Sequence, residues 1–304
     1  MRKVLVTGGT GFIGSHCLAP LQARGFEVHA VTSRNASSQA TGVTWHRADL
    51  LDVESIGPLF EAVRPTHLLH LAWYVVPGKV MTAEVSFDWV ASSLEMMKAF
   101  ARAKGARLVI SGSSYEYDWD YGYCNEVLTP KTANTVYGHC KNALRLLMES
   151  YSQTHGMTCA WPRIFFLYGP NEHPDRLVSS VIRSVLREQD APCSHGNQIR
   201  DYLFVQDVAD ALVALLDSDV EGAVNIGAGQ PITLREIVTT AGRMMGRPDL
   251  IKLGAIPSRS NDTPLVIADV ARLTNTLGWK PRYSLEEGLR VTIEWWRTEL
   301  ANGR

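Results

Sequence analysis

The chain has 304 residues, with 30 Lys+Arg against 31 Asp+Glu, a formal net charge of −1 and 45% hydrophobic residues. This composition excludes a disordered scaffold, and the balanced charge gives no basic excess for binding nucleic acid or an anionic membrane. No apolar run reaches the roughly 18 residues of a membrane span. The five cysteines contain no C-x-x-C pair, so neither a disulfide framework nor a metal site is expected. We therefore expect a soluble cytoplasmic protein.

Short β-branched runs alternate with longer helical stretches over the first two-thirds of the chain. The predicted strands are Lys3–Thr7, Glu27–Thr32, Val43–Arg47, Thr66–Leu71, Arg107–Ser111 and Thr158–Pro162. The predicted helices are Ile13–Arg24, Val53–Val63, Ala83–Lys104 and Thr135–His155. This alternation is typical of an α/β protein with a doubly wound parallel sheet of the Rossmann type, covered by helices on both faces.

The pattern loosens after about Arg163, where Pro and Gly recur. Further helices are predicted at Leu177–Glu188, Asp207–Asp217, Leu234–Met245 and Ser284–Leu300, with one more strand at Val224–Ile226. We expect a dinucleotide-binding domain formed by residues 1–164 and 202–228. A smaller C-terminal α/β substrate-binding lobe would then comprise residues 165–201 and 229–304.

A glycine-rich turn follows the first predicted strand and reads Thr7-Gly-Gly-Thr-Gly-Phe-Ile-Gly14. Its glycines let the backbone turn tightly and approach a pyrophosphate, which the N–H groups and dipole of the next helix hold. A tight strand–helix turn alone also selects glycine, but the position at the first strand–helix junction favours a dinucleotide site. The contacts expected from this turn are Gly8, Thr10, Gly11, Phe12, Ile13 and Gly14.

The end of the second strand bears on the choice between NAD and NADP. An acidic residue there binds the ribose 2′-hydroxyl of NAD, whereas a positive charge accommodates the 2′-phosphate of NADP. Thr32-Ser33-Arg34 contains no carboxylate, and Ser33 and Arg34 can bind phosphate oxygens. NADP(H) is therefore favoured, and NAD(H) stays possible because Arg34 can also be an ordinary solvated arginine. Asp49 suits the adenine edge, or is a plain loop aspartate.

Tyr137-Gly-His-Cys-Lys141 places a tyrosine and a lysine on one face of the helix predicted from Thr135. A free phenol, with a pKa of about 10, is a poor proton shuttle at neutral pH. A nearby ammonium and an oxidised nicotinamide favour the phenolate and lower that pKa. Ser113 follows the fifth strand, where it can hydrogen-bond a reacting carbonyl. Together these residues predict a catalytic set.

With these motifs in place, the chain resembles the extended short-chain dehydrogenase/reductase family, in its nucleotide-sugar epimerase/dehydratase branch. The resemblance covers essentially the whole chain. Its motifs are TGGTGFIG, His70-Leu-Ala72, Ser113, Tyr137-x-x-x-Lys141, Pro162-Arg163, Tyr168-Gly-Pro170, Arg200-Asp-Tyr-Leu-Phe-Val-Gln-Asp207, Val224-Asn-Ile-Gly227 and Leu277-Gly-Trp279.

This resemblance implies a nucleotide-sugar substrate and a catalytic triad of Ser113, Tyr137 and Lys141, the last two also touching the cofactor. Arg200 and Arg259 match arginines that hold a substrate diphosphate, the favoured interpretation, although each can also form a structural ion pair. Other cofactor contacts are expected from Leu50, Leu71, Ala72 and Pro162. Substrate contacts are expected from Trp73, Ser113, Ser114, Tyr115, Phe166, Arg200, Arg259 and Asp262. In similar proteins the helices at 83–104 and 135–155 pair to form a homodimer, although they can also be core helices.

Departures from the family pattern narrow the reaction. Similar dehydratases carry Asp-Glu directly after the catalytic serine or threonine, where this chain has Ser114 and Tyr115, and Glu116 lies one residue too far along. Epimerase-reductases that invert C3 and C5 carry a cysteine where Tyr115 stands. Phe166 replaces an asparagine that often contacts the substrate. Trp73 either gives the sugar side of the pocket an aromatic ring or is an ordinary packing residue. Because these positions provide no second acid or base, the expected reaction is a single hydride transfer at one carbinol or ketone.

Two enzymatic reactions are compatible with this site. The favoured one is an NADPH-dependent reduction of a nucleotide-linked 4-keto-6-deoxysugar, in which Tyr137 donates the proton and Ser113 polarises the carbonyl. The alternative is a 4-epimerase that retains its NAD. The end of the second strand favours NADP(H), and net reduction commonly draws on NADPH. The predicted cofactor preference therefore favours the reductase. A non-catalytic dinucleotide-binding protein is disfavoured because such relatives typically lose the Tyr/Lys pair.

Overall fold

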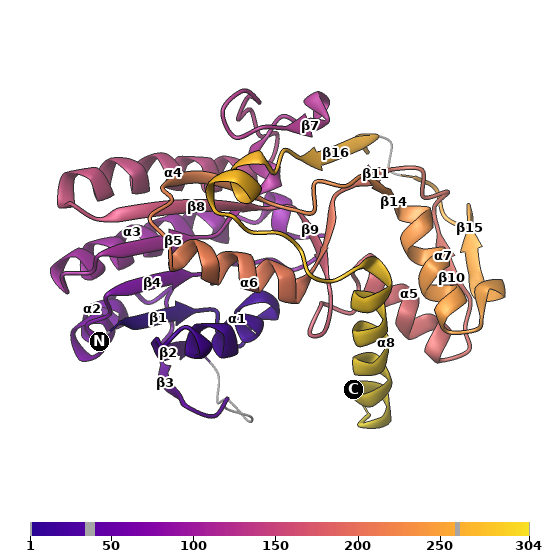
Figure 1. Ribbon diagram of the computed structural model, residues 1–304, viewed down its shortest axis with the longest axis horizontal. Helices are drawn as coiled ribbons and strands as arrows, with labels where there is room; N and C mark the ends of the chain where they lie inside the picture. Colours follow the sequence, from indigo (N-terminus) through magenta and orange to yellow (C-terminus); the bar gives the residue numbers. More distant parts are fainter. Residues whose placement is uncertain (1, 34–39, 259–261, 304) are drawn as a thin grey trace.

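The structure is a computed structural model that describes residues 2–33, 40–258 and 262–303. Its largest element is a parallel sheet with strand order β13-β8-β5-β4-β1-β2-β3, with β6 beside β8 (Figure 1). The strands are β1 Lys3–Thr7, β2 Glu27–Thr32, β3 Val43–Arg47, β4 His67–His70, β5 Arg107–Ile110, β6 Gly112–Ser113, β8 Thr158–Ile164 and β13 Gly222–Ile226. Every neighbouring pair is parallel, which confirms the predicted doubly wound fold.

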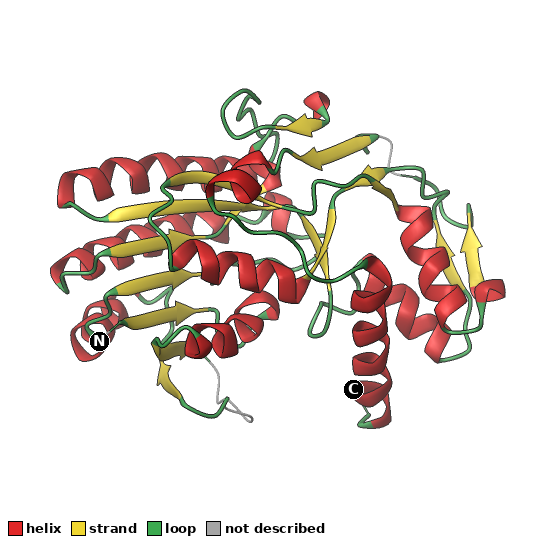
Figure 2. Ribbon diagram, viewed as in Figure 1, coloured by secondary structure: helices red, strands yellow, loops and turns green. Residues whose placement is uncertain are grey.

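Helices cover both faces of this sheet (Figure 2). Helices α1 Phe12–Ala23 and α6 Val205–Leu216 pack on one face, and α2 Ile56–Val63, α3 Val85–Arg102 and α4 Val136–His155 pack on the other. Successive side chains of a strand point to opposite faces, so Val4 and Val6 join the α1–α6 core while Leu5 joins the α2–α4 core. Both cores are apolar, as a parallel sheet requires.

The remaining elements build the smaller α/β lobe that the sequence predicts. Its helices are α5 Leu177–Leu186, α7 Leu234–Met244 and α8 Leu285–Ala301, which share a core with Tyr168 and Phe204. Its short strands pair as β10–β15, β12–β9 and β14-β11-β16-β7. These strands are β7 Tyr123–Cys124, β9 Phe166–Tyr168, β10 Ala191–Cys193, β11 Ile199–Arg200, β12 Tyr202–Phe204, β14 Ile232–Thr233, β15 Ile251–Leu253 and β16 Leu265–Ala268. β7 and β12 pair with strands of the smaller lobe although they fall within the residues predicted for the dinucleotide-binding domain. The residue boundaries assigned to the two parts stay a prediction.

Differences from the predicted elements have local causes. The helix predicted at 53–63 begins as a 3-10 turn, η1 Val53–Ser55, because Asp52 Oδ1 accepts the N–H of Glu54 at 3.2 Å. The strands of the smaller lobe contain two to four residues each, too few to show alternation in the sequence. The other short helical turns are η2 Val80–Thr82, η3 Ser114–Glu116, η4 Trp119–Tyr121, η5 Pro248–Leu250 and the π-helical η6 Arg272–Thr276.

Three further observations concern the described residues as a group. None of the helices within the described ranges is long and apolar enough to cross a bilayer. All five cysteines are described, and each is a buried free thiol. Within the same residues no group of three His, Cys, Asp or Glu side chains is arranged to hold a metal ion.

Candidate active site

The turn between β1 and α1 brings backbone into close contact with backbone. Gly8 has a φ of 72°, and its carbonyl accepts the N–H of Gly11 at 2.9 Å. A Cβ at Gly14 would lie 2.1 Å from the Gly8 oxygen, and a Cβ at Gly8 would lie 2.9 Å from the nitrogen of Ala72. Gly11 is the N-cap of α1 and has no side chain with which to cap it, so the first-turn N–H groups can meet an anion. The turn therefore fits a dinucleotide pyrophosphate.

Other predicted cofactor residues flank this turn. Thr10 is exposed and Phe12 and Ile13 are half-buried at the start of α1. Pro162 is buried in β8 and pairs with Val224 of β13. On the other side of β8 the pairing is interrupted at Pro162, because Ala160 pairs with β5 and Arg163 pairs with β6. This gap in the pairing tolerates the missing N–H of proline.

A chain of hydrogen bonds fixes the ends of β1 and β4. Thr7 Oγ1 accepts the N–H groups of Leu71 and Ala72, both at 3.1 Å, and contacts His70 Nδ1 at 2.6 Å. His70 Nε2 lies 2.9 Å from Ser93 Oγ, whose own hydrogen goes to a carbonyl one turn earlier in α3. We therefore assign Thr7 as the donor to Nδ1 and Nε2–H as the donor to Ser93. Burial lowers the pKa of His70 to about 3, so the ring is neutral.

At the end of β2, Thr32 is buried and Ser33 is exposed, while Arg34 lies outside the described residues. The predicted adenine contact Asp49 is exposed, and its Oδ1 accepts the N–H of Leu51 at 3.0 Å. Asp49 Oδ1 thus caps the turn that Asp49 itself begins. Leu50 is buried, and its carbonyl accepts the hydroxyl of a serine in α3.

Ser113, Tyr137 and Lys141 come together at the carboxyl end of the sheet. Thr135 caps α4 by accepting the N–H of Gly138 at 3.1 Å, so Tyr137 and Lys141 occupy successive turns of one face. The hydroxyls of Ser113 and Tyr137 are hydrogen-bonded. The three residues are 7%, 8% and 1% exposed, respectively.

Burial controls the protonation of Tyr137 and Lys141, the predicted catalytic pair. It raises the pKa of Tyr137 above its usual value, and the hydrogen bond with Ser113 opposes the rise only in part. It lowers the pKa of Lys141 to about 7, against the attraction of the Glu116 carboxylate. Lys141 Nζ donates to the Ser111 carbonyl at 2.8 Å. In this arrangement Tyr137 is therefore a neutral phenol that can donate a proton, and the lowering of its pKa expected beside an oxidised nicotinamide stays a prediction.

Glu116 points away from the reacting groups, as the sequence predicts. Its fully buried carboxylate accepts the N–H of Ser113 at 2.7 Å, Trp161 Nε1 at 2.8 Å and Arg163 Nε at 2.8 Å. A Cβ at Gly112 would lie 2.2 Å from Trp161 Nε1 and 2.6 Å from Glu116 Oε1. The sequence analysis did not identify Glu116 as the residue that holds Ser113, the predicted catalytic serine. The signal was the Ser-x-x-Glu spacing, which forms a capping box here.

Aromatic rings form a continuous wall from Tyr137 into the smaller lobe. Ring centroids are separated by 6.2 Å from Tyr137 to Tyr115 and by 4.3 Å from Tyr115 to Trp119. The wall continues over 5.8 Å to Phe166 and 5.5 Å to Tyr202. Tyr115 and Phe166 were predicted as substrate contacts. Trp119 and Tyr202 were not, because only the fold brings them beside the site.

Arg200 lies against this wall with its charge already paired. Its Nη2 donates to Asp262 at 2.6 Å and its Nη1 to a backbone carbonyl at 2.9 Å. The guanidinium carbon is 5.5 Å from the Phe166 ring centroid, and Arg200 is only 4% exposed. The arrangement is thus the structural ion pair, with Asp262 as the partner. Ser114 is buried nearby, and Arg259 lies outside the described residues.

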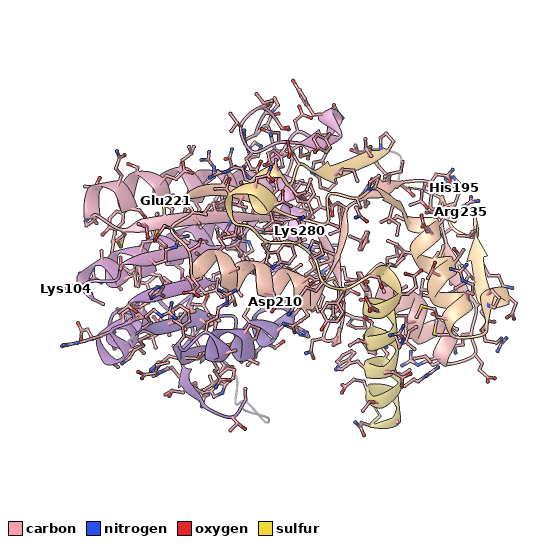
Figure 3. The ribbon with its side chains drawn as sticks, in the orientation of Figure 1. Lys104, His195, Asp210, Glu221, Arg235 and Lys280 are labelled. Atoms are coloured by element: carbon pink, nitrogen blue, oxygen red, sulfur yellow. The ribbon has the colours of Figure 1, made fainter. Side chains whose placement is uncertain are left out.

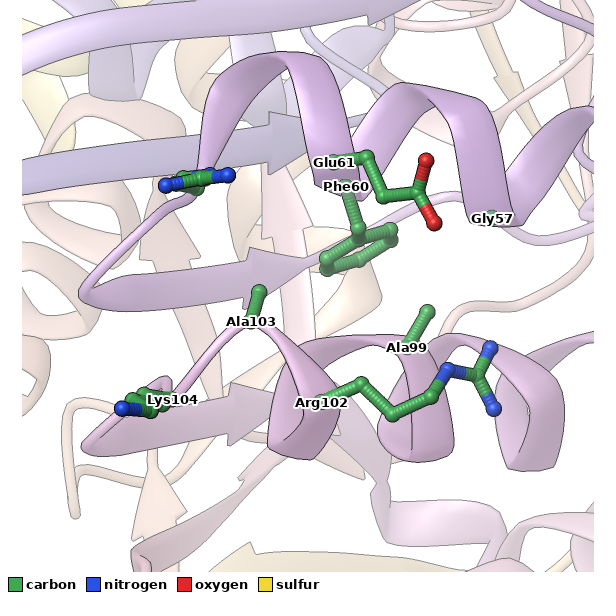
Figure 4. A pocket seen from close by; sticks show the side chains of 8 residues that line it. Gly57, Phe60, Glu61, Ala99, Arg102, Ala103 and Lys104 are labelled. Carbon is green, nitrogen blue, oxygen red and sulfur yellow. The ribbon is translucent and has the colours of Figure 1, made fainter.

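A separate concavity of about 340 Å³ lies between α2 and α3 (Figure 4). It is lined by Gly57, Phe60, Glu61, Arg64, Ala99, Arg102, Ala103 and Lys104. The ends of α2 and α3 precede β4 and β5, so this concavity lies at the amino edge of the sheet, opposite the catalytic residues. Lys104 lies at the end of the molecule remote from the smaller lobe, which carries Arg235 (Figure 3).

Comparison with known proteins gives consistent matches. A family model described as the NAD dependent epimerase/dehydratase family matches residues 4–227. UDP-glucuronic acid decarboxylase 6 of Arabidopsis thaliana is 29% identical, over 98% of this chain and 90% of its own length. The crystal structure of UDP-glucose 4-epimerase from Thermus thermophilus with NAD has a TM-score of 0.83 and 27% identity, over 97% and 99% of the two chains. MoeE5 in complex with UDP-glucose and NAD has a TM-score of 0.81 and 30% identity, over 98% and 99%.

Proposed function

The chain belongs to the NAD-dependent epimerase/dehydratase family, and from this premise we propose that it reduces a nucleotide-linked 4-keto-6-deoxysugar at C4. The dinucleotide would supply the hydride. The proposal rests chiefly on Tyr137, a buried neutral phenol hydrogen-bonded with Ser113, because a reduction needs a proton donor at the sugar oxygen. Ser113 would polarise the carbonyl, and Lys141 would hold the cofactor ribose.

Two features support reduction over dehydration. Ser114 and Tyr115 supply no carboxylate for the elimination of water, and the carboxylate of Glu116 is bound to three other groups. The rings of Tyr115, Trp119 and Phe166 form an apolar wall suited to the face of a sugar that carries a methyl group at C6.

The proposal is tested by incubating purified protein with NADPH or NADH and a panel of nucleotide-linked 4-keto-6-deoxysugars while following the nicotinamide absorbance. Stoichiometric oxidation of the reduced cofactor, with the sugar alcohol as product, is expected. If no member of the panel oxidises either cofactor, the reductase proposal is wrong.

A 4-epimerase is the second candidate, and the similarity to UDP-glucose 4-epimerase in complex with NAD favours it. In that reaction Tyr137 would first accept the proton of the C4 hydroxyl and later return it. Interconversion of nucleotide sugars without added cofactor would identify this reaction. UDP-glucuronic acid belongs in the same assay because of the similarity to the decarboxylase, and release of carbon dioxide would identify that reaction.

The cofactor preference is a separate prediction, made from Ser33 and Arg34. We propose that NADP(H) is preferred, because the second-strand end carries positive charge and no carboxylate. The Arg34→Ala variant should raise KM for NADPH about tenfold or more and change KM for NADH little, because a charge-assisted contact with the 2′-phosphate is lost. Equal changes for both cofactors would contradict the preference.

We also propose that the chain is a cytoplasmic homodimer joined through α3 and α4. Phe87, Leu146 and Leu147 are exposed on these helices at 61%, 55% and 46%. An apolar groove runs between the helices, lined by Phe87, Val90, Val136, His139, Cys140 and Ala143. The buried free thiols suit a reducing compartment.

Sedimentation of the Leu147→Glu variant tests this interface. A buried, unpaired charge should convert the dimer to monomers. The matched control is Leu128→Glu, in a loop outside both helices, where the leucine is 81% exposed and dimerisation should be unaffected. A dimeric Leu147→Glu variant would contradict the assignment.

A further inference from the structure

The indole of Trp73 lies over the ammonium group of Lys141. Nζ is 3.7 Å from the ring centroid, and it donates to the Ser111 carbonyl at 2.8 Å. Lys141 is only 1% exposed, so the ring and the carbonyl replace water around the charge. A cation over an aromatic face is attracted by the ring quadrupole, most strongly when water is excluded.

Two aromatic side chains pack against the Trp73 ring in this position. Trp89 of α3 lies beside it at a centroid distance of 6.0 Å and an interplanar angle of 27°, and Tyr137 meets it edge-on at 6.3 Å. The buried indole Nε1 has no hydrogen-bond partner in the described part of the chain. Packing of the ring, rather than a hydrogen bond from its nitrogen, therefore fixes its orientation.

Several other groups act electrostatically at the same position. The Glu116 carboxylate of η3 favours the charged lysine, as does the Cys140 side chain of α4. His70 of β4 also interacts with Lys141 and is neutral, and the phenol of Tyr137 is neutral as well. The Glu116 carboxylate thus favours the charged lysine but is hydrogen-bonded to three other donors. The groups in direct contact with the ammonium are the Trp73 ring face and the Ser111 carbonyl.

We propose that Trp73 is a positioning residue that keeps Lys141 charged and aimed within the catalytic site through the face of its indole ring. The role of Lys141 in catalysis rests on the proposed function, whereas the contact between ring and ammonium does not. The ring stabilises the protonated form, so a weaker ring face lowers the pKa of Lys141, which burial has already brought to about 7. Activity that requires the ammonium should then be lost at a lower pH.

The test changes the electrons of the ring at nearly constant shape. Tryptophans with increasing fluorine content are introduced at position 73 by amber suppression, because fluorine withdraws electron density from the ring face. The pKa of Lys141 is followed in the full-length protein by carbon-13 NMR of the lysine ε-carbon, assigned with the Lys141→Met variant. A stepwise fall of about one pH unit across the series is expected. The alkaline limb of the kcat profile should move by the same amount.

The matched control places the same fluorinated residues at Trp89, which neighbours Trp73 but is not the ring over the ammonium, and little change is expected there. A Lys141 pKa that stays constant across the Trp73 series would overturn the proposal, because a ring that only excludes water is insensitive to fluorination. A falling series in a protein without reductase or epimerase activity would uphold the contact and refute the proposed function. A constant series in an active enzyme would do the reverse.

Discussion

The Tyr137→Phe variant should lose about three orders of magnitude in kcat while binding the dinucleotide with unchanged affinity. The hydroxyl is the proton donor in the proposed reduction, and its partner in this structure is Ser113. The ring itself packs edge-on against Trp73 and Tyr115, contacts that phenylalanine preserves. Single-turnover kinetics and calorimetric titration with the cofactor measure the two quantities separately.

The control for this variant is Tyr151→Phe, at the other end of the same helix. Tyr151 stacks on His155 at a centroid distance of 3.9 Å, remote from the catalytic face, so turnover should be unaffected. A Tyr137→Phe enzyme that turns over at the full rate would remove the phenol from the mechanism.

Replacing Glu116 with leucine should reduce the free energy of unfolding by about 3–5 kcal/mol, because it leaves the guanidinium of Arg163 buried without its counter-ion. Both side chains are almost completely buried, at 0% and 1% exposed. Turnover should also fall, because the Ser113 N–H loses the carboxylate that fixes it. Chemical denaturation and kcat provide the two measurements.

A double-mutant cycle separates the cost of an unpaired charge from the net contribution of the pair. The Glu116→Leu/Arg163→Leu protein should be clearly more stable than the sum of the two single variants predicts, because no isolated charge remains buried. Strictly additive losses would mean that the two side chains do not interact. The Tyr117→Phe variant removes the 3.0 Å contact of Arg163 Nη1 and the 2.7 Å hydrogen bond from the Tyr117 hydroxyl to Asn225. It leaves the Glu116–Arg163 pair in place and should leave kcat unchanged.

The sequence predicted the parallel sheet and the position of α4, which carries Tyr137 and Lys141, because both depend on local signals. β-branched runs marked the long strands, and Thr135 followed by Tyr137 and Lys141 marked α4 and its catalytic face. The glycine turn was equally local. Each of these features lies within about ten consecutive residues, so its physical basis could be recognised without knowledge of the fold.

The contacts that complete the site were not predictable in the same way. Trp119 and Tyr202 extend the aromatic wall although they lie more than 80 residues apart, and their strands and turns have three residues each. The burial that raises the pKa of Tyr137 could not be predicted either, because the spacing of residues along a helix does not report how deeply a side chain is buried. For Arg200 the sequence left both a phosphate contact and an ion pair open, and the pairing with Asp262 depends on two distant segments meeting.

The close approach at Gly112 has an evolutionary consequence. A Cβ at position 112 would lie within 2.6 Å of both the indole nitrogen of Trp161 and the carboxylate of Glu116. Even an alanine at position 112 would therefore clash with both side chains. Glycine, tryptophan and glutamate should therefore be inherited as a set. In an alignment of homologous sequences, positions 112, 116 and 161 should covary. Homologues with a larger residue at position 112 should lack both the glutamate and the tryptophan.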